Sequence, residues 1–170
     1  MEHRIARRAQ DVGASLIRQM FVYANDVPGY VSLGVGVPSF ALPKYTAREL
    51  ASAVTKYRGG INKYVLGLGL PELNQAVARK LESNGIQADP KREILITAGS
   101  AGGLSWAFQT LVDTGNEVIL PSPAYSNHVD GVKIAGGIPV YVPLLEDDGY
   151  RLDVKRIEEA VTERTKAILF

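Results

Sequence analysis

Apolar residues in the second half of the chain follow two spacings in turn. Short continuous apolar runs, typical of buried strands, are followed by segments whose apolar positions recur every three or four residues, typical of helices. The predicted strands are 92–97, 117–120, 138–142 and 167–170, and the predicted helices are 101–112, 125–135 and one that begins at Asp153. Strands that alternate with helices of this length form a mainly parallel sheet flanked by helices. The pattern therefore predicts an α/β fold.

The part of the chain before residue 92 has helical spacing in three places. Helices are predicted at 3–24, at 45–58 and from Pro71 to Gly85. Proline suits the first position of a helix because its missing N–H would have no partner there. Between the first two helices, a stretch rich in glycine and proline contains one strand-like run, Tyr30 to Leu33. An N-terminal helical arm is therefore expected before the sheet.

The composition narrows the classes of function. The 170 residues are 46% apolar and 22% charged, as in one ordinary globular domain or most of one. A net charge of +1, spread along the chain, does not predict nucleic acid as a partner. No apolar run approaches the length of a membrane span. The chain has no cysteine and two histidines, so neither a disulfide nor a metal site is expected, and a cytoplasmic location is compatible with the sequence.

Small residues stand where the predicted strand 92–97 passes into the predicted helix 101–112. Gly99, Ser100 and Ala101 would let a ligand approach the first backbone N–H groups of the helix. These N–H groups have no partner within a helix, and together with the helix dipole they favour an anion such as phosphate. The same residues also fit a tight turn in which Ser100 is the N-cap.

A third interpretation of this turn is a nucleophile elbow, because Ala98 to Gly102 resembles the G-x-S-x-G pattern of serine hydrolases. Such an enzyme also needs an acid and a histidine base, which follow the serine in the chain in that order. His128 stands in the very next predicted helix, which is too early for that order. A serine hydrolase that uses Ser100 therefore remains only an alternative.

Five stretches resemble, in order and spacing, the N-terminal half of class I/II aminotransferases, which are pyridoxal-phosphate enzymes of the aspartate aminotransferase fold (fold type I). The stretches are YVSLGVGVPSFALP, GINKYVLGLGLPELNQAVA, EILITAGSAGGL, GNEVILPSPAYSNHVDGVKIAGGIPVYVPL and RTKAILF. The resemblance runs from about Tyr30 to Phe170. It implies transfer of an amino group between an amino acid and a 2-oxo acid, with pyridoxal 5′-phosphate as cofactor.

The resemblance also implies roles for particular residues. The turn Gly99-Ser100-Ala101 corresponds to the family's cradle for the cofactor phosphate. Tyr125 corresponds to the aromatic residue that stacks on the pyridine ring. His128 corresponds to a histidine that, in some members, supports the aspartate bound to the pyridine nitrogen.

Two further residues are implied by the resemblance, in the part of the chain before the predicted sheet. Tyr64 corresponds to a tyrosine that reaches the phosphate of the neighbouring subunit, which implies a homodimer. Gly36 corresponds to a glycine that lies against the substrate carboxylate. Residues 1–45 would then belong to the N-terminal arm and part of the small domain, and residues 46–170 to the large, cofactor-binding domain.

The resemblance assigns no catalytic residue to this chain, because the family's Schiff-base lysine comes after the position that matches Phe170. The sequence also ends inside an apolar run. Both features lead us to expect the first part of a longer protein that is inactive by itself. The alternatives are a lyase or synthase of the same fold, a serine hydrolase, and a module without catalytic function.

Overall fold

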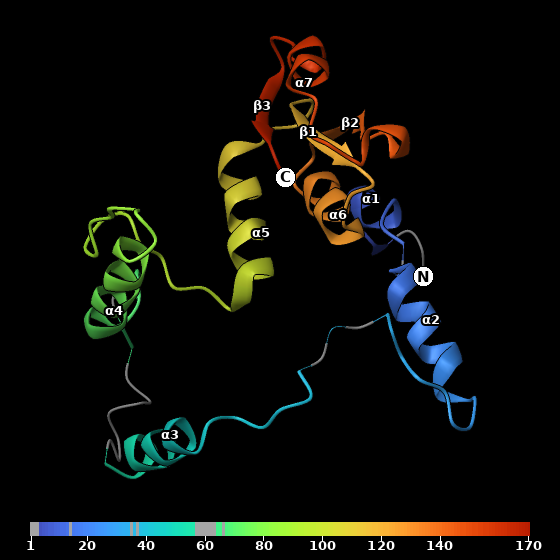
Figure 1. Cartoon of the computed structure of the whole chain (residues 1–170). Coiled ribbons are helices and arrows are strands. Elements are labelled where there is room, and N and C mark those ends of the chain that lie inside the picture. The colour runs from blue at the N-terminus through green and yellow to red at the C-terminus, as the bar shows by residue number, and fades with distance from the viewer. Residues whose placement is uncertain (1–3, 14, 35, 37, 57–63, 66) are drawn as a thin grey trace. The chain divides into compact units, whose positions relative to one another are not determined.

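A computed structural model of the chain describes residues 4–13, 15–34, 36, 38–56, 64–65 and 67–170 (Figure 1). The chain divides into two compact units, one made of Met1–Tyr30 with Ala98–Phe170 and the other of Val31–Thr97. The expected boundary between residues 45 and 46 concerns the domains of a longer protein, and it stays a prediction.

The first unit is built on a parallel three-stranded sheet in the order β2-β1-β3. Strand β1 (Glu117–Ser122) pairs along its whole length with β2 (Ile138–Pro143). On its other side, the first part of β1 pairs with β3 (Thr165–Ile168). The central position of β1 explains its continuous apolar run, because a strand between two neighbours and under helices meets little water. Three of its residues, Val118, Ile119 and Leu120, are fully buried. The parallel α/β sheet predicted from the sequence is confirmed.

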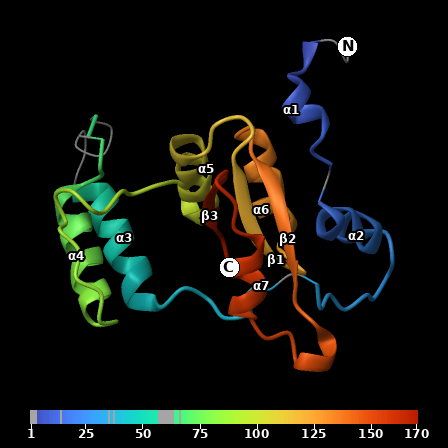
Figure 2. The same cartoon turned by 90° about the horizontal axis from the view of Figure 1, so that it is seen from above.

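Helices α5 (Gly99–Leu111) and α6 (Ser126–Ile134) pack against each other beside this sheet (Figure 2). Their core contact joins Phe108 of α5 and Val112, the residue after α5, to Val132 of α6 and Val118 of β1. A Cβ at Gly131 would lie 2.9 Å from Phe108 Cε2, so glycine allows the two helices to approach closely here. The unit also contains the short helix η2 (Glu146–Asp148) and helix α7 (Val154–Ala160), and α7 contacts β2.

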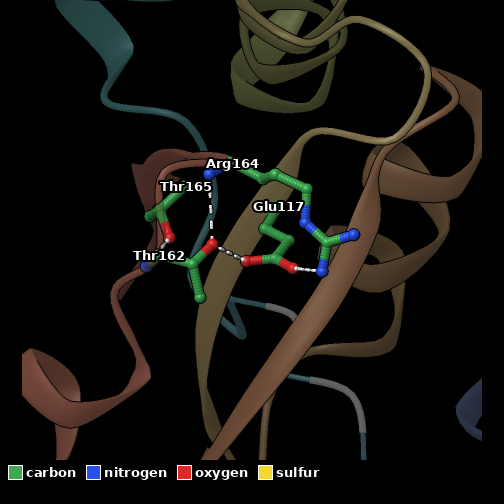
Figure 3. A network of polar contacts seen from close by, with 4 residues as sticks. All are labelled: Glu117, Thr162, Arg164 and Thr165. Carbon is green, nitrogen blue, oxygen red and sulfur yellow. Dashed lines mark hydrogen bonds and ion pairs between the residues drawn. The ribbon is translucent and has the colours of Figure 1, made fainter.

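A polar network joins the amino ends of β1 and β3 (Figure 3). Glu117 is 4% exposed, and its carboxylate accepts a hydrogen bond from Thr162 Oγ1 at 2.6 Å and forms an ion pair with Arg164. The Thr162 hydroxyl, and the Arg164 guanidinium after it, hold the pKa of Glu117 below its ordinary value of 4.5, although burial opposes them. Because Glu117 begins β1, the network lies at the opposite end of the sheet from Ser122.

The second unit contains helices α3 (Lys44–Lys56) and α4 (Pro71–Glu82). Pro71 occupies the start of α4 as predicted, and Gly85, with φ +81°, ends the helical segment while Ile86 N donates to Leu81 O at 3.0 Å. The buried Asn74 side chain donates from Nδ2 to three carbonyl oxygens. These belong to Leu68, Pro90 and Ile94, at 3.4, 3.2 and 3.1 Å. Asn74 therefore connects α4 to the segments on either side of it.

Three predicted elements differ from the structure. The predicted helix 3–24 is divided into α1 (Arg7–Gln10) and α2 (Leu16–Asn25), with Gly13, a poor helix former, between them. The predicted strands 30–33 and 92–97 are wrong as strands within the described residues. A strand needs a hydrogen-bonded neighbour, and no described strand lies beside either segment. The predicted end of helix 45–58 lies outside the described residues.

Candidate functional site

The amino end of α5 has an unusual backbone. Gly99 has φ +73°, a left-handed conformation that glycine adopts without strain, and an added Cβ would meet nothing within 4 Å. The conformation, and not the available space, therefore selects glycine here. The N-cap is Ala98, which makes no side-chain cap hydrogen bond. The interpretation of Ser100 as the N-cap is wrong, because Ser100 lies one residue inside the helix.

Ser100 and Ala101 are both exposed in the first turn of α5. Their backbone N–H groups stand at the end of the helix where the dipole is positive, and the Ser100 hydroxyl adds a further donor. This terminus can therefore accept an anion at its main chain. Within the described residues, no hydrogen bond joins Ser100 to His128, so the pair lacks the contact that a serine nucleophile and its base would make.

Tyr125 is placed by the turn that follows β1, in which the Ser122–Pro123 peptide is cis. It is the N-cap residue of α6, and its carbonyl oxygen accepts from His128 N at 2.9 Å. The rings of Tyr125 and His128 meet edge to face, with centroids 5.3 Å apart and planes at 86°. Asn127 Nδ2 donates to the Tyr125 hydroxyl oxygen at 3.0 Å. The motif signal at PSPAYSNH pointed to Tyr125 and His128 but not to Asn127.

A cavity of about 230 Å³ lies between α5 and α6; we call it the α5–α6 groove. It is lined by Ser100, Ala101, Leu104, Ser105, Phe108, Tyr125, Asn127, His128, Asp130, Gly131 and Ile134. Four residues proposed from the sequence, Ser100, Ala101, Tyr125 and His128, therefore share one groove although they come from two helices. Gly99, the first residue of α5, stands directly before the lining residue Ser100.

Tyr64 and Gly36 belong to the second unit. The Tyr64 side chain is fully exposed, and Gly36 is exposed with nothing within 4 Å of an added Cβ. The α5–α6 groove belongs to the first unit, so the roles proposed for Tyr64 and Gly36 stay predictions.

A larger cavity, of about 980 Å³, lies at the opposite ends of α5 and α6 and contains none of the predicted site residues. Its charged lining residues are Arg7, Arg8, Asp11 and Lys133. Among the described residues, no three or more histidine, aspartate or glutamate side chains are grouped so that they could hold a metal ion. No helix in the described part of the chain is long and apolar enough to span a membrane.

Comparison with known proteins defines the class. The model of the family "Aminotransferase class I and II" matches residues 28–170, and the chain belongs to this family. Among its relatives, aromatic-amino-acid aminotransferase 2 of Thermococcus litoralis is 36% identical over 166 residues, which are 97% of this chain and 42% of the relative. Aspartate aminotransferase of Pyrococcus abyssi is 36% identical over 159 residues, 93% of this chain and 40% of the relative.

Solved structures agree with this assignment. The aspartate aminotransferase from Thermus thermophilus with maleate superposes with a TM-score of 0.88 at 31% identity, and the match covers 96% of this chain and 43% of that one. The chain thus spans about 40% of the length of the curated relatives that it matches.

Proposed function

We propose that the whole protein is an aminotransferase that moves an amino group between an amino acid and a 2-oxo acid, with pyridoxal 5′-phosphate as cofactor. The observation that carries this proposal is the meeting of Ser100, Ala101, Tyr125 and His128 in one groove. Family membership supports the same activity, because the relatives are named aminotransferases.

Two features of the groove support binding of the cofactor. The phosphate would take the N–H groups of Ser100 and Ala101, at a helix terminus whose N-cap, Ala98, makes no side-chain cap hydrogen bond. The aromatic ring would lie on Tyr125, whose side chain is half exposed beside the groove. A flat aromatic face packs on a conjugated ring and keeps water from that side. His128 supports Tyr125 through its edge-to-face contact.

The bound cofactor supplies an electron sink for the carbanion at the substrate Cα. The chain's own residues bind and orient it. None of the side chains that line the groove is a lysine. We propose that the amine which holds the cofactor and moves the Cα proton comes from a part of the protein outside these 170 residues.

The remaining assignments extend this proposal. Tyr64 would reach the phosphate in the neighbouring subunit of a homodimer, and Gly36 would lie against the substrate carboxylate; both roles are supported by the family resemblance. We propose the cytoplasm as the location. The proposal names no particular amino acid, because the relatives are named for aspartate and for aromatic amino acids.

The test is amino transfer by the product of the complete reading frame that contains this chain. With pyridoxal 5′-phosphate present, we expect ¹⁵N to pass from labelled aspartate or tyrosine to a 2-oxo acid. Release of ammonia or carbon dioxide without amino transfer would contradict the proposal and favour a lyase or a decarboxylating synthase. Ser100→Asp, which places a carboxylate where the phosphate is proposed to bind, should abolish transfer, whereas Ser83→Asp, in the second unit, should not.

A further inference from the structure

The ring of Tyr125 is half exposed, so packing against the protein restrains it only in part. Its side chain is 52% exposed and rotates about two bonds, Cα–Cβ and Cβ–Cγ. A stacking surface is useful only if its plane and position are set before the ligand arrives, since ordering a mobile side chain on binding weakens affinity. The residues that set this ring therefore affect the site without touching the ligand.

Two directional contacts restrain the ring, and they act on different motions. The hydroxyl oxygen lies on the axis about which the ring turns, so the hydrogen bond from Asn127 opposes swinging of the side chain about Cα–Cβ. The edge-to-face contact with His128, at 86°, opposes rotation of the ring plane about Cβ–Cγ. Position and plane are thus restrained by two different residues of α6.

We propose that Asn127 is a positioning residue that holds the ring of Tyr125 in place for stacking against the cofactor. This inference rests on the proposed function, in which Tyr125 is the stacking surface. Asparagine in the first turn of a helix commonly bonds the nearby backbone, but here its Nδ2 donates to the phenol. The phenol oxygen accepts this bond, and its own proton remains available for another acceptor.

Nuclear magnetic resonance of the 170-residue chain without ligand tests the positioning itself. The ring ¹H–¹³C signals of Tyr125 are assigned by comparison with Tyr125→Phe. Asn127→Ala should shift these signals towards those of a freely moving tyrosine. Asn127→Asp should restore them, because the carboxylate accepts the phenol proton and the negative charge is favourable near the amino end of α6. Asn84→Ala, which removes an exposed asparagine of the second unit, is the control and should leave them unchanged.

Binding of pyridoxamine 5′-phosphate tests the consequence for the ligand. This compound lacks the aldehyde that would react with the chain's lysines, and its binding can be followed by the fluorescence of Trp106, the only tryptophan, next to Ser105 of the groove. Asn127→Ala should weaken binding about fivefold, as expected for one hydrogen bond. Asn127→Asp should bind within about twofold of the parent chain. Competition by inorganic phosphate should be equal in all variants, because the ring and not the phosphate site is altered.

The inference is overturned if Asn127→Ala leaves the Tyr125 ring signals unchanged, or if the signals move while the affinity for pyridoxamine 5′-phosphate stays the same. A parent chain that does not bind pyridoxamine 5′-phosphate at all would contradict the proposed groove itself, and the inference with it. The ring signals recorded without ligand distinguish the two failures.

Discussion

Glu117 is a buried residue whose carboxylate contacts two residues of one short segment, Thr162 and Arg164. Thr162 and Arg164 both stand just before β3. The network therefore connects the start of the edge strand β3 to the start of the central strand β1. Removing one partner of a buried charge leaves the other without compensation, and this loss is larger than the net gain of forming the pair. Charge at Glu117 should therefore influence the stability of the sheet.

We predict that acid destabilises the parent chain more steeply than Glu117→Gln. The folded-state pKa of Glu117 is lowered, so the carboxylate contributes stability that is present above pH 4.5 and is lost as the pH falls below that value. Glutamine does not titrate, and the variant should show a flatter dependence in this range. Urea unfolding at a series of pH values measures the difference. Equal slopes for the two proteins would contradict the assignment, and Glu163→Gln is the control on the same segment.

At the scale of residues, the sequence motifs named four residues that the structure places together, while their roles stay predictions. Ser100, Ala101, Tyr125 and His128 stand in two contiguous stretches, and the structure brings these stretches to one groove. Asn127 was missed although it stands between Tyr125 and His128, because the direction of a side chain in a first helical turn is not fixed by residue type. The buried Asn74 was missed for a similar reason: its partners are main-chain carbonyls, which have no signature in the sequence.

Among the elements, α7 shows how a single cap residue sets a helix boundary. Asp153 Oδ1 accepts from the backbone N of Lys155 and Arg156 at 3.0 and 3.4 Å, and Asp153 was the predicted start of this helix. The N-cap of α2, Ser15, makes no side-chain cap bond. The N-cap side chain therefore bonds the backbone in α7 and does not do so in α2.

We predict that Asp153→Ala destabilises the chain by about 1 kcal/mol, the usual loss for an N-cap that bonds the backbone. Asp153→Asn should cost less than about 0.5 kcal/mol, because it keeps the cap and loses only a half-exposed ion pair with Arg156. Ser15→Ala should change little. Chemical denaturation followed by circular dichroism measures all three. A loss for Asp153→Asn as large as for Asp153→Ala would show that the charge, and not the cap, stabilises α7.

Elements that carry their own start and stop signals were predicted well. Pro71 and Gly85 bound the α4 segment, Asp153 is the N-cap of α7, and the small residues from Gly99 begin α5. Residues 30–33 and 92–97 have apolar runs like those of strands, but strand formation depends on a partner elsewhere in space. An apolar run in the sequence occurs both in strands that have a partner and in segments that have none. Only the structure shows which of the two applies.

For the molecule as a whole, the proposed homodimer makes a specific prediction about shared sites. If Tyr64 reaches the phosphate of the neighbouring subunit, then a site uses Ser100 from one subunit and Tyr64 from the other. A mixed dimer of Ser100→Asp and Tyr64→Phe subunits would contain one site with both changes and one site with neither.

We therefore expect co-expression of the two complete-frame variants to recover about a quarter of the parental amino transfer, given random pairing of subunits in a symmetric dimer. Each variant alone should be strongly impaired at limiting cofactor. Differently tagged subunits, purified in tandem, isolate the mixed dimer, which should keep about half of the parental activity. No recovery in the mixed dimer would mean that Tyr64 serves its own subunit, and full activity of Tyr64→Phe alone would mean that Tyr64 serves no site.

The central claim is that the α5–α6 groove holds a phosphorylated pyridine ring, with the phosphate at Ser100 and Ala101 and the ring on Tyr125. Titration of the ¹⁵N-labelled chain with pyridoxamine 5′-phosphate, followed by amide chemical shifts, tests it directly. We predict saturable shifts at Ser100 and Ala101 together with the first turn of α6. Shifts centred instead on Arg7, Arg8 and Lys133 around the larger cavity, or no saturable shift at all, would contradict the claim.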